Sequence, residues 1–412
     1  MSLVARKFKI SYAAFFSIFA IFGTSMTVVG ATLPRILGDF GWSYGQAGIV
    51  IAGGAIAYFL STYAAGRIVG RIGPKASILF GIAACAVALA LFASSPSLAM
   101  NLLLYALVGA GQGFLEVSIN WCVLRMGEPA DAKAPRESAE NVEGRALSLI
   151  HGAFAIGAVV GPFAVGSIMS VGLSWSLVYR VIAGVFGLSF LFVLPLDLHA
   201  LGREKPKQGG SSRGGFRRSP AYWLGFATLF LYVGAELGIS NWAGEYFVRI
   251  FGTSDATGSF MVSLFWAGLM AGRLGIPALL KRVRQDRLLF SLSVLLSVAT
   301  GLLAASGVAG HSGFGMAALA ITVAGLGASC VYPAAVSLVG AAFPENQGEA
   351  IGFASTGGGV GAFVFPFLMS RIASGYGVLS GFAFYAAITV LSAATAATLG
   401  HAVRARRAAF KA

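Results

Sequence analysis

Long apolar stretches separated by short polar ones are the main feature of this chain. Twelve of them approach the roughly 20 residues that a helix rising about 1.5 Å per residue needs to cross a bilayer. They cover residues 11–32, 43–65, 76–95, 99–122, 146–168, 174–196, 220–247, 257–280, 287–307, 313–340, 348–370 and 376–401. Runs such as Ile78 to Phe92 do not alternate as the strands of a membrane barrel do. The pattern predicts an all-α membrane protein with 12 transmembrane helices.

A polar stretch near the middle divides the chain. Residues 198–219 contain Gly-Gly-Ser-Ser and several bases, the composition of a flexible linker. We expect it to be a cytoplasmic linker between two six-helix halves, residues 1–197 and 220–412. A weak internal repeat, AGRI at 65–68 and AGRL at 271–274, indicates that the halves are pseudo-symmetric. Two such halves facing each other across a central cavity suit alternating access.

The distribution of charge sets the expected topology. With the N-terminus inside, 25 of the 29 Lys and Arg fall on the inner side, and four remain outside: Arg35, Arg180, Arg249 and Arg371. Because cytoplasmic loops collect bases, both termini are predicted to be cytoplasmic. The formal charge of +14 thus needs no nucleic acid to explain it, since the bases lie between apolar spans. We predict a multi-pass protein of the plasma (cell inner) membrane that works as a monomer.

Composition agrees with this class. Hydrophobic residues make up 57% of the chain and charged residues 11%, against roughly 25% charged residues in soluble domains. The three cysteines lie in apolar runs without a metal-ligand spacing, so no metal site is predicted.

The segment after the second span carries a recognisable motif. It reads Gly66-Arg67-Ile68-Val69-Gly70-Arg71-Ile72-Gly73-Pro74-Lys75 and resembles the Gly-x-x-x-Asp-Arg-x-Gly-Arg-Lys signature of the major facilitator superfamily, with Gly70 in place of the Asp. The resemblance implies the major facilitator fold. It also implies a gating role for Gly66, Arg67, Arg71 and Lys75. A basic cytoplasmic turn that only sets the topology is the alternative. We add Arg273, the repeat counterpart of Arg67, to this gating set.

A narrower resemblance, to the fucose:proton symporter family of sugar permeases, rests on four stretches: residues 111–120, 149–157, 234–242 and 265–273. In that family an Asp in span one and a Glu in span four handle protons. The span-four acid corresponds to Glu116, whereas the span-one position, four residues before Pro34, is Gly30. His151, which opens span five in one of these stretches, is a further candidate for gating or proton relay because histidine can change its charge at physiological pH. A helix-cap or packing role is the alternative for this residue.

Three polar residues in span four are candidates for solute and proton binding. Gln112, Glu116 and Asn120 are four residues apart, so they line one face of a helix. Amides and carboxylates can hydrogen-bond adjacent hydroxyls of a polyhydroxy solute. A carboxyl at membrane depth costs at least about 2.5 kcal/mol unless it faces a cavity or a partner, and such acids often relay protons. A purely structural Glu116 bonded to a neighbouring helix is the alternative.

The second half offers a matching set. Glu236 and Ser240 repeat the four-residue spacing in span seven, and Glu236 is a candidate for both solute and proton binding. Residues that only contact the solute would be Gln112, Asn120, Ser240, Asn241, Trp242, Trp266 and Tyr332. Packing or interface anchoring is the alternative for the aromatic members. Glu245, nearer the outer end, we interpret as a solvated or gate residue.

These features predict a secondary active transporter that moves a small polar solute, most simply a sugar, by proton-coupled symport. No ATP-binding motif occurs, and no catalytic constellation lies in the spans, so neither enzyme activity nor a cofactor is predicted. Residues 157–162, from Gly157 to Pro162, look like a motif of drug antiporters, which keeps proton-driven efflux of drugs or metabolites as the alternative. Sodium coupling also stays open.

Overall fold

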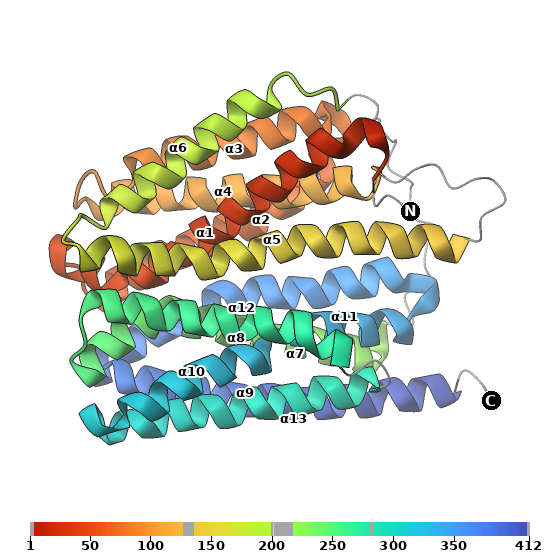
Figure 1. Cartoon of the computed structure of the whole chain (residues 1–412). Coiled ribbons are helices and arrows are strands. Elements are labelled where there is room, and N and C mark those ends of the chain that lie inside the picture. Colours follow the sequence, from red (N-terminus) through yellow and green to blue (C-terminus); the bar gives the residue numbers. More distant parts are fainter. Residues whose placement is uncertain (1–3, 127–135, 199–200, 202–216, 280–282, 410–412) are drawn as a thin grey trace. The chain divides into compact units, whose positions relative to one another are not determined.

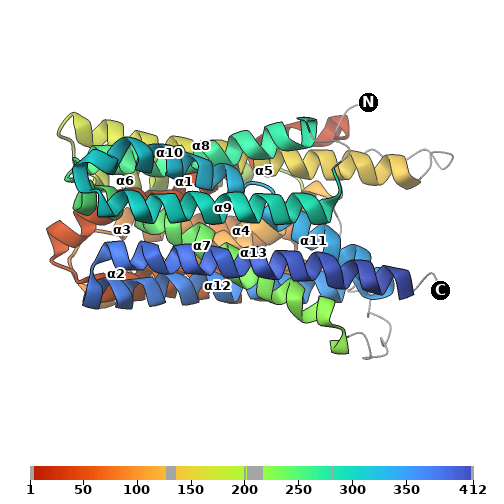
Figure 2. The same cartoon turned by 90° about the horizontal axis from the view of Figure 1, so that it is seen from below.

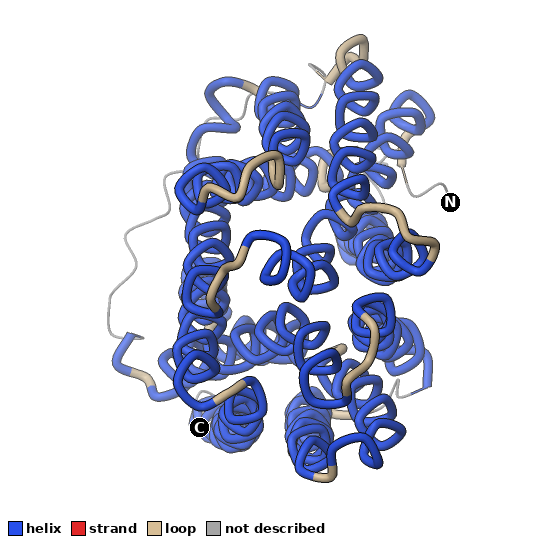
Figure 3. The backbone as a smooth tube through the Cα atoms, turned by 90° about the vertical axis from the view of Figure 1, so that its left-hand side faces the viewer, coloured by secondary structure: helices blue, strands red, loops and turns tan. Residues whose placement is uncertain are grey.

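The computed structural model describes residues 4–126, 136–198, 201, 217–279 and 283–409. These ranges contain helices, turns and loops, and no strand is found among them (Figure 3). Twelve helical segments within them are long and apolar enough to cross a membrane, which confirms the predicted all-α class. Most of the predicted linker, residues 198–219, lies outside the described residues.

Thirteen α-helices are formed by the described residues (Figure 1). They are α1 (Lys9–Phe40), α2 (Tyr44–Ile72), α3 (Pro74–Leu91), α4 (Leu98–Val123), α5 (Arg136–Ser170), α6 (Ser176–Val193), α7 (Pro220–Phe251), α8 (Asp255–Leu279), α9 (Gln285–Val308), α10 (Phe314–Ala328), α11 (Val331–Ala342), α12 (Gln347–Tyr376) and α13 (Val378–Ala409). Helices α10 and α11 together make the tenth candidate span.

The chain forms two compact units. Unit 1 comprises Met1–Val28, Gly53–Ala164 and Val171–Gln208, and unit 2 comprises Val29–Ala52, Val165–Ser170 and Gly209–Ala412. Helices α1, α2 and α5 therefore each contribute to both units. The outer ends of α1 and α2, by the predicted topology, belong to the same unit as α7 to α13.

In unit 1, α3 packs against α4 and α6, and the three run side by side in Figure 1. The turn before α4 is fixed by Asn101, whose side chain accepts from the amide of Ala93 (3.0 Å) and donates to the carbonyl of Ser95 (2.7 Å). Ser97 caps α4 by accepting from the amide of Met100. These bonds satisfy backbone groups that a helix end leaves open, and so they fix where α4 begins.

In unit 2, α7 is the helix around which the others pack. It contacts α8, α11, α12 and α13, while α9 lies beside α13 and α10 (Figure 2). Its large aromatic side chains Tyr232, Trp242, Tyr246 and Phe247 are completely buried. A helix that is apolar on most sides suits such a central position.

Several helices extend beyond the predicted spans, and one predicted span is divided. Helix α1 continues past residue 32 to Phe40 with Pro34 inside it, although proline removes one helix hydrogen bond to the carbonyl four residues earlier, that of Gly30. The predicted span 313–340 is divided at Ser329 and Cys330, between α10 and α11. The carbonyl groups at this break are bonded by side chains of α7 and α8, as described below.

Candidate functional site

The polar residues of span four lie on one uninterrupted helix, α4, in unit 1. Glu116 is half-buried, and its Oε2 accepts a hydrogen bond from the hydroxyl of Tyr58 on α2. Gln112 is buried and donates to Ser25 Oγ of α1 (2.9 Å). Asn120 is half-buried, and its Oδ1 has no hydrogen-bond partner in the described part of the chain. This helix face thus carries a half-buried acid and a half-buried amide, and the oxygen of that amide is a buried acceptor without a partner in the described ranges.

Close packing of α4 on α2 brings Tyr58 to Glu116. A Cβ on Gly109 would lie 2.1 Å from the carbonyl oxygen of Gly54, and one on Gly113 would lie 2.7 Å from the carbonyl oxygen of Tyr58. Both distances are too short for any side chain. Small residues four apart let membrane helices approach in this way. The spacing of these glycines therefore determines which residue of α2 reaches the acid.

The corresponding face of α7 lies in unit 2. Glu236 is buried, with 7% of its surface exposed, and Ser240 is buried one turn further along. Ser240 Oγ accepts a hydrogen bond of 2.7 Å from the indole nitrogen of Trp266 on α8. The structure thus joins two residues that the sequence predicted as solute contacts. Their role in binding stays a prediction.

Glu236 lies next to the break between α10 and α11. Arg273 of α8 donates from Nε to the carbonyl of Ser329 (3.1 Å), and its Nη2 lies 4.0 Å from Glu236 Oε1. Tyr232, one turn before Glu236, donates to the carbonyl of Ala328 (2.7 Å). Interrupted membrane helices need such donors, because their freed carbonyls have no water to bond. Transporters use such breaks to build binding sites.

The other predicted solute contacts in unit 2 are less closely grouped. Tyr332 on α11 is half-buried and donates to Ser355 Oγ of α12 (3.0 Å). Asn241 is half-buried. Trp242 is completely buried, and its ring meets that of Tyr44 edge-on at 5.6 Å. In this conformation Trp242 therefore presents no ring face to a solute, and Trp266 is only 3% exposed.

The predicted gating residues of unit 1 lie where α2 gives way to α3. Gly73 there has a φ of +87°, which favours glycine, and it directly precedes Pro74 at the start of α3. Arg67 and Arg71 are exposed, and the Arg67 guanidinium lies 4.0 Å from the ring centroid of Tyr63. Lys75 is half-buried and Gly66 has open space around its Cα. None of the three bases forms an ion pair with another described residue.

His151 is half-buried in α5, with its ring 5.4 Å from that of Phe19 in an edge-on arrangement. Of the gating candidates, only Arg273 has a carboxylate neighbour among the residues that the structure describes. No cluster of three or more His, Cys, Asp and Glu side chains that could hold a metal is found in those ranges.

Sequence reasoning missed the partners of these residues. Tyr58 and Ser25 are each one of several hydroxyl residues in their spans, and the only available signal was that a buried polar group needs a partner. Arg273 was assigned to gating through the repeat, whereas its contact with Glu236 depends on the bend of the chain at the α10–α11 break.

Comparison with known proteins places these features in a family. The profile of the Major Facilitator Superfamily matches residues 15–321 and 286–411, so the chain belongs to this superfamily. It is therefore a membrane transporter and not an enzyme.

Individual relatives are distant. A glucose/galactose transporter of Brucella abortus is 23% identical over 359 residues, which cover 84% of this chain and 83% of that protein. The "Bypass of stop codon protein 6" of Saccharomyces cerevisiae is 22% identical over 304 residues, which are 68% of this chain but only 58% of the yeast protein.

Solved structures share the fold. A mutant of the nucleoside transporter NupG superposes with a TM-score of 0.75 at 16% identity, covering 95% of this chain and 99% of that one. A D-xylose-proton symporter gives a TM-score of 0.73 at 14% identity, with coverage of 94% and 96%. At this identity the likeness supports the fold alone.

Proposed function

We propose that this protein imports a neutral sugar or a similar polyhydroxy solute by proton-coupled symport with alternating access. The observation that carries the proposal is Glu116, a half-buried carboxyl in the middle of a membrane helix with one hydroxyl donor, that of Tyr58. No base pairs with it among the described residues. An acid in this setting can take up and release a proton at little structural cost, because its hydrogen bond from Tyr58 persists in either state.

The polar residues next to Glu116 and Glu236 support a polyhydroxy solute. Asn120 Oδ1 is an acceptor without a partner in the described ranges, and Ser240 and Tyr332 offer hydroxyl groups. Hydroxyl, amide and carboxyl groups can both donate to and accept from a sugar. The relationship to a glucose/galactose transporter over most of both chains supports the same solute class.

The efflux alternative is weakened by the role of its motif. Gly157 and Gly161 face α1: a Cβ on Gly157 would lie 1.7 Å from the carbonyl oxygen of Ala20, and one on Gly161 would lie 3.0 Å from the Thr24 methyl group. Thr24 also donates to the carbonyl of Gly157 (3.0 Å). The close packing of α5 on α1 therefore accounts for these glycines without a drug substrate.

The test uses purified protein in liposomes that contain a pH-sensitive dye. Separate panels of neutral sugars, sugar acids, other carboxylates and lipophilic cations are added outside. We expect the lumen to acidify on addition of one or a few neutral sugars. Proton movement in the opposite direction, elicited only by lipophilic compounds, would instead establish efflux. Sugar uptake driven by a sodium gradient alone would show that sodium, and not the proton, is the coupling ion.

A further inference from the structure

Residues 29–52 form the predicted outer ends of α1 and α2 and the turn between them. They belong to unit 2, whereas the remainder of α1 and most of α2 belong to unit 1. If the transporter works by alternating access, as proposed above, this segment has to leave its position in unit 2 whenever the outer side opens. The contacts that hold it are therefore candidates for a gate.

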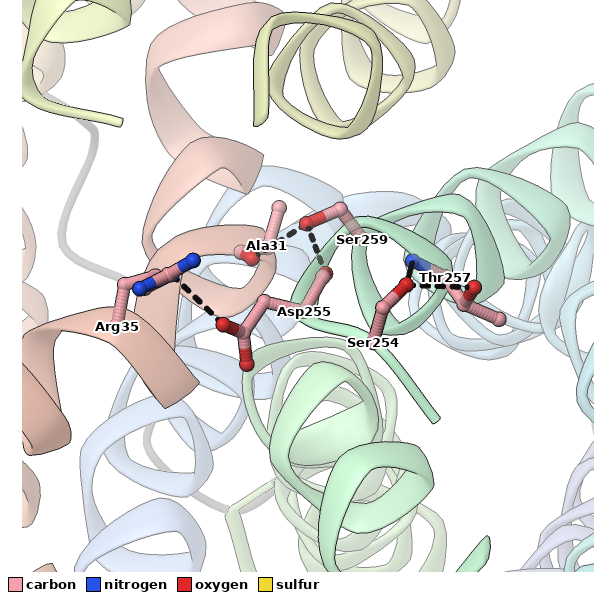
Figure 4. A network of polar contacts seen from close by, with 6 residues as sticks. All are labelled: Ala31, Arg35, Ser254, Asp255, Thr257 and Ser259. Carbon is pink, nitrogen blue, oxygen red and sulfur yellow. Dashed lines mark hydrogen bonds and ion pairs between the residues drawn. The ribbon is translucent and has the colours of Figure 1, made fainter. Parts of the chain in front are cut away.

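The first contact is between α1 and α8 (Figure 4). Arg35 Nε and Asp255 Oδ2 are 2.7 Å apart, with 50% and 25% of the two side chains exposed. Ser259 is completely buried and donates to the carbonyl of Ala31 (2.7 Å). Ser254 caps the start of α8 by accepting from the amide of Thr257 (3.2 Å), which fixes the turn that carries Asp255.

The second contact joins α2 to α7 through a buried acid. Glu245 has 0% of its surface exposed, so it is not the solvated residue that the sequence allowed. Its Oε1 accepts from the hydroxyl of Tyr44 (2.8 Å) and from Nε of Arg249 (2.7 Å). Its Oε2 is equally buried and has no hydrogen-bond partner within the described ranges.

The backbones of α1 and α7 come very close where these contacts form. A Cβ on Gly30 would lie 2.5 Å from the carbonyl oxygen of Ser240, and a Cβ on Gly244 would lie 2.6 Å from the carbonyl oxygen of Gly30. Pro34 has no amide hydrogen to donate to the Gly30 carbonyl, so this carbonyl is free to face α7. The segment is therefore held by close packing and by charged hydrogen bonds together.

Protonation of Glu245 would weaken this arrangement. While it is ionised, its Oε1 can hold both Tyr44 and the always charged Arg249, and hydrogen bonds to charged groups are the stronger ones. Its Oε2, which no donor in the described ranges reaches, is a costly buried anionic oxygen and the natural place for a proton.

Other charged groups around Glu245 are of both signs. Asp255 on α8 is paired with Arg35 of α1. Arg371 of α12 lies instead against α2 at Gly45, with its Nη1 3.6 Å from the position that a Cβ on Gly45 would take. Apart from Arg249 and Asp255, no charged side chain in the described part of the chain acts on Glu245.

We propose that Tyr44, Glu245 and Arg249 form the proton-responsive latch of an outer gate closed by residues 29–52, and that external acid opens it. The Arg35–Asp255 pair is a second contact that holds the same segment. Such a gate admits solute when protons are abundant outside, which is the condition under which symport can be driven inward.

Site-specific labelling tests the latch without any solute. Ser259→Cys places a thiol of similar size beneath the closed segment, and Ala47→Cys provides an independent buried position on α2. Ser312→Cys, at an exposed position in the turn between α9 and α10, serves as the reference for the intrinsic reaction rate at each pH. The native cysteines Cys85, Cys122 and Cys330 are buried, so the unmodified protein gives the background. The reagent is a membrane-impermeant maleimide added outside intact liposomes.

At neutral external pH we expect both buried probes to react slowly relative to the reference, and acidification to increase their relative rate. Glu245→Gln and Tyr44→Phe should each raise the neutral rate by about tenfold and remove the acid response, since Gln leaves Tyr44 and Arg249 only a neutral acceptor and Phe removes the donor on α2. Tyr63→Phe is the matched control on the exposed side of α2 and should change nothing.

Substitutions of the Arg35–Asp255 pair distinguish a general weakening of the closed gate from the loss of its response to protons. Arg35→Gln should raise the neutral rate but keep the acid response, and the exchanged pair Arg35→Asp with Asp255→Arg should restore the slow rate. The proposal is overturned if acid leaves the relative rate unchanged, if Glu245→Gln keeps the response, or if both buried probes react as fast as the reference at neutral pH.

The outcome is independent of the solute. Failure of every sugar to move protons would refute the proposed function and leave the labelling result standing, whereas a pH-insensitive gate would leave sugar transport untouched.

Discussion

Replacing Glu116 by Gln should separate transport from its driving force. The substitution keeps the size of the side chain and leaves an amide oxygen that can still accept from Tyr58. The hydrogen bond changes from a charged or acidic acceptor to a neutral one, which costs about 1 kcal/mol, too little to unfold a protein of this size. The ability to carry a proton is lost entirely.

The expected magnitude follows from the gradient. A difference of one pH unit is worth about 1.4 kcal/mol per proton, so one-to-one symport can concentrate a solute about tenfold. Liposomes with an acidic outside and sodium-free buffers should show this accumulation with the unmodified protein. With Glu116→Gln the internal concentration should only equal the external one, while exchange of labelled for unlabelled solute continues.

Two comparisons make the result decisive. Tyr58→Phe retains the carboxyl and should therefore retain concentrative uptake, even if it is slower. Tenfold accumulation by Glu116→Gln would refute the coupling role, and loss of exchange in a folded Glu116→Gln protein would assign Glu116 to solute binding instead. Protein-free liposomes measure the passive leak of the solute. Uptake under an inward sodium gradient, with equal pH on both sides, tests for sodium coupling.

Three further predictions concern solute binding and packing. Glu236→Gln should raise the KM for exchange by about tenfold, the loss of one charged hydrogen bond, and leave the accumulation ratio intact; an unchanged KM would make its role structural. Gly113→Ala should lower the free energy of unfolding by about 1–3 kcal/mol through overpacking. Gly152→Ala is the control, because Gly152 in α5 has open space where the Cβ would lie, and it should not lower that free energy. Trp266→Phe removes the donor to Ser240 and should cost about 1 kcal/mol; an equal melting temperature would contradict the bond.

The sequence was sufficient for the helices and for their class. Long apolar runs predict membrane spans because the bilayer leaves the backbone few alternatives, and the structure confirms 12 such segments. Helix ends were less predictable. The continuation of α1 through Pro34 to Phe40 depends on neighbouring helices that bond and pack against the loosened turn.

The break in span ten had one signal in the sequence, Pro333, which the prediction did not use. Pro333 has no amide hydrogen to donate to the carbonyl of Ser329, four residues earlier, but the apolar run on both sides of it predicted a single span over 313–340. The break is stabilised from outside, by the Tyr232 hydroxyl on one carbonyl and the Arg273 guanidinium on the next. These two contacts join residues that are 96 and 56 positions apart, which a local pattern cannot reveal.

The candidate site was predicted in part for the same reason. Helical spacing placed Gln112, Glu116 and Asn120 on one face of α4 because the period of the helix alone decides this. Their individual partners depend on which turn of α2 or α1 lies opposite. That register is set by glycine contacts such as Gly113 against Tyr58, whose meaning appears only once the helices are in place.

Gly30 bears on both proton coupling and the outer gate. It occupies the span-one position at which the fucose-type symporters, as the resemblance implies, carry an Asp for protons. In this structure the space beyond its Cα is filled by α7, since a Cβ would lie 2.5 Å from the carbonyl oxygen of Ser240. A carboxylate at position 30 and this approach of α1 to α7 therefore exclude each other. Glycine at position 30 thus leaves span one without a proton-carrying acid and, at the same time, permits the close contact between α1 and α7. Under the proposed mechanism, coupling then rests on Glu116 without a second acid in span one.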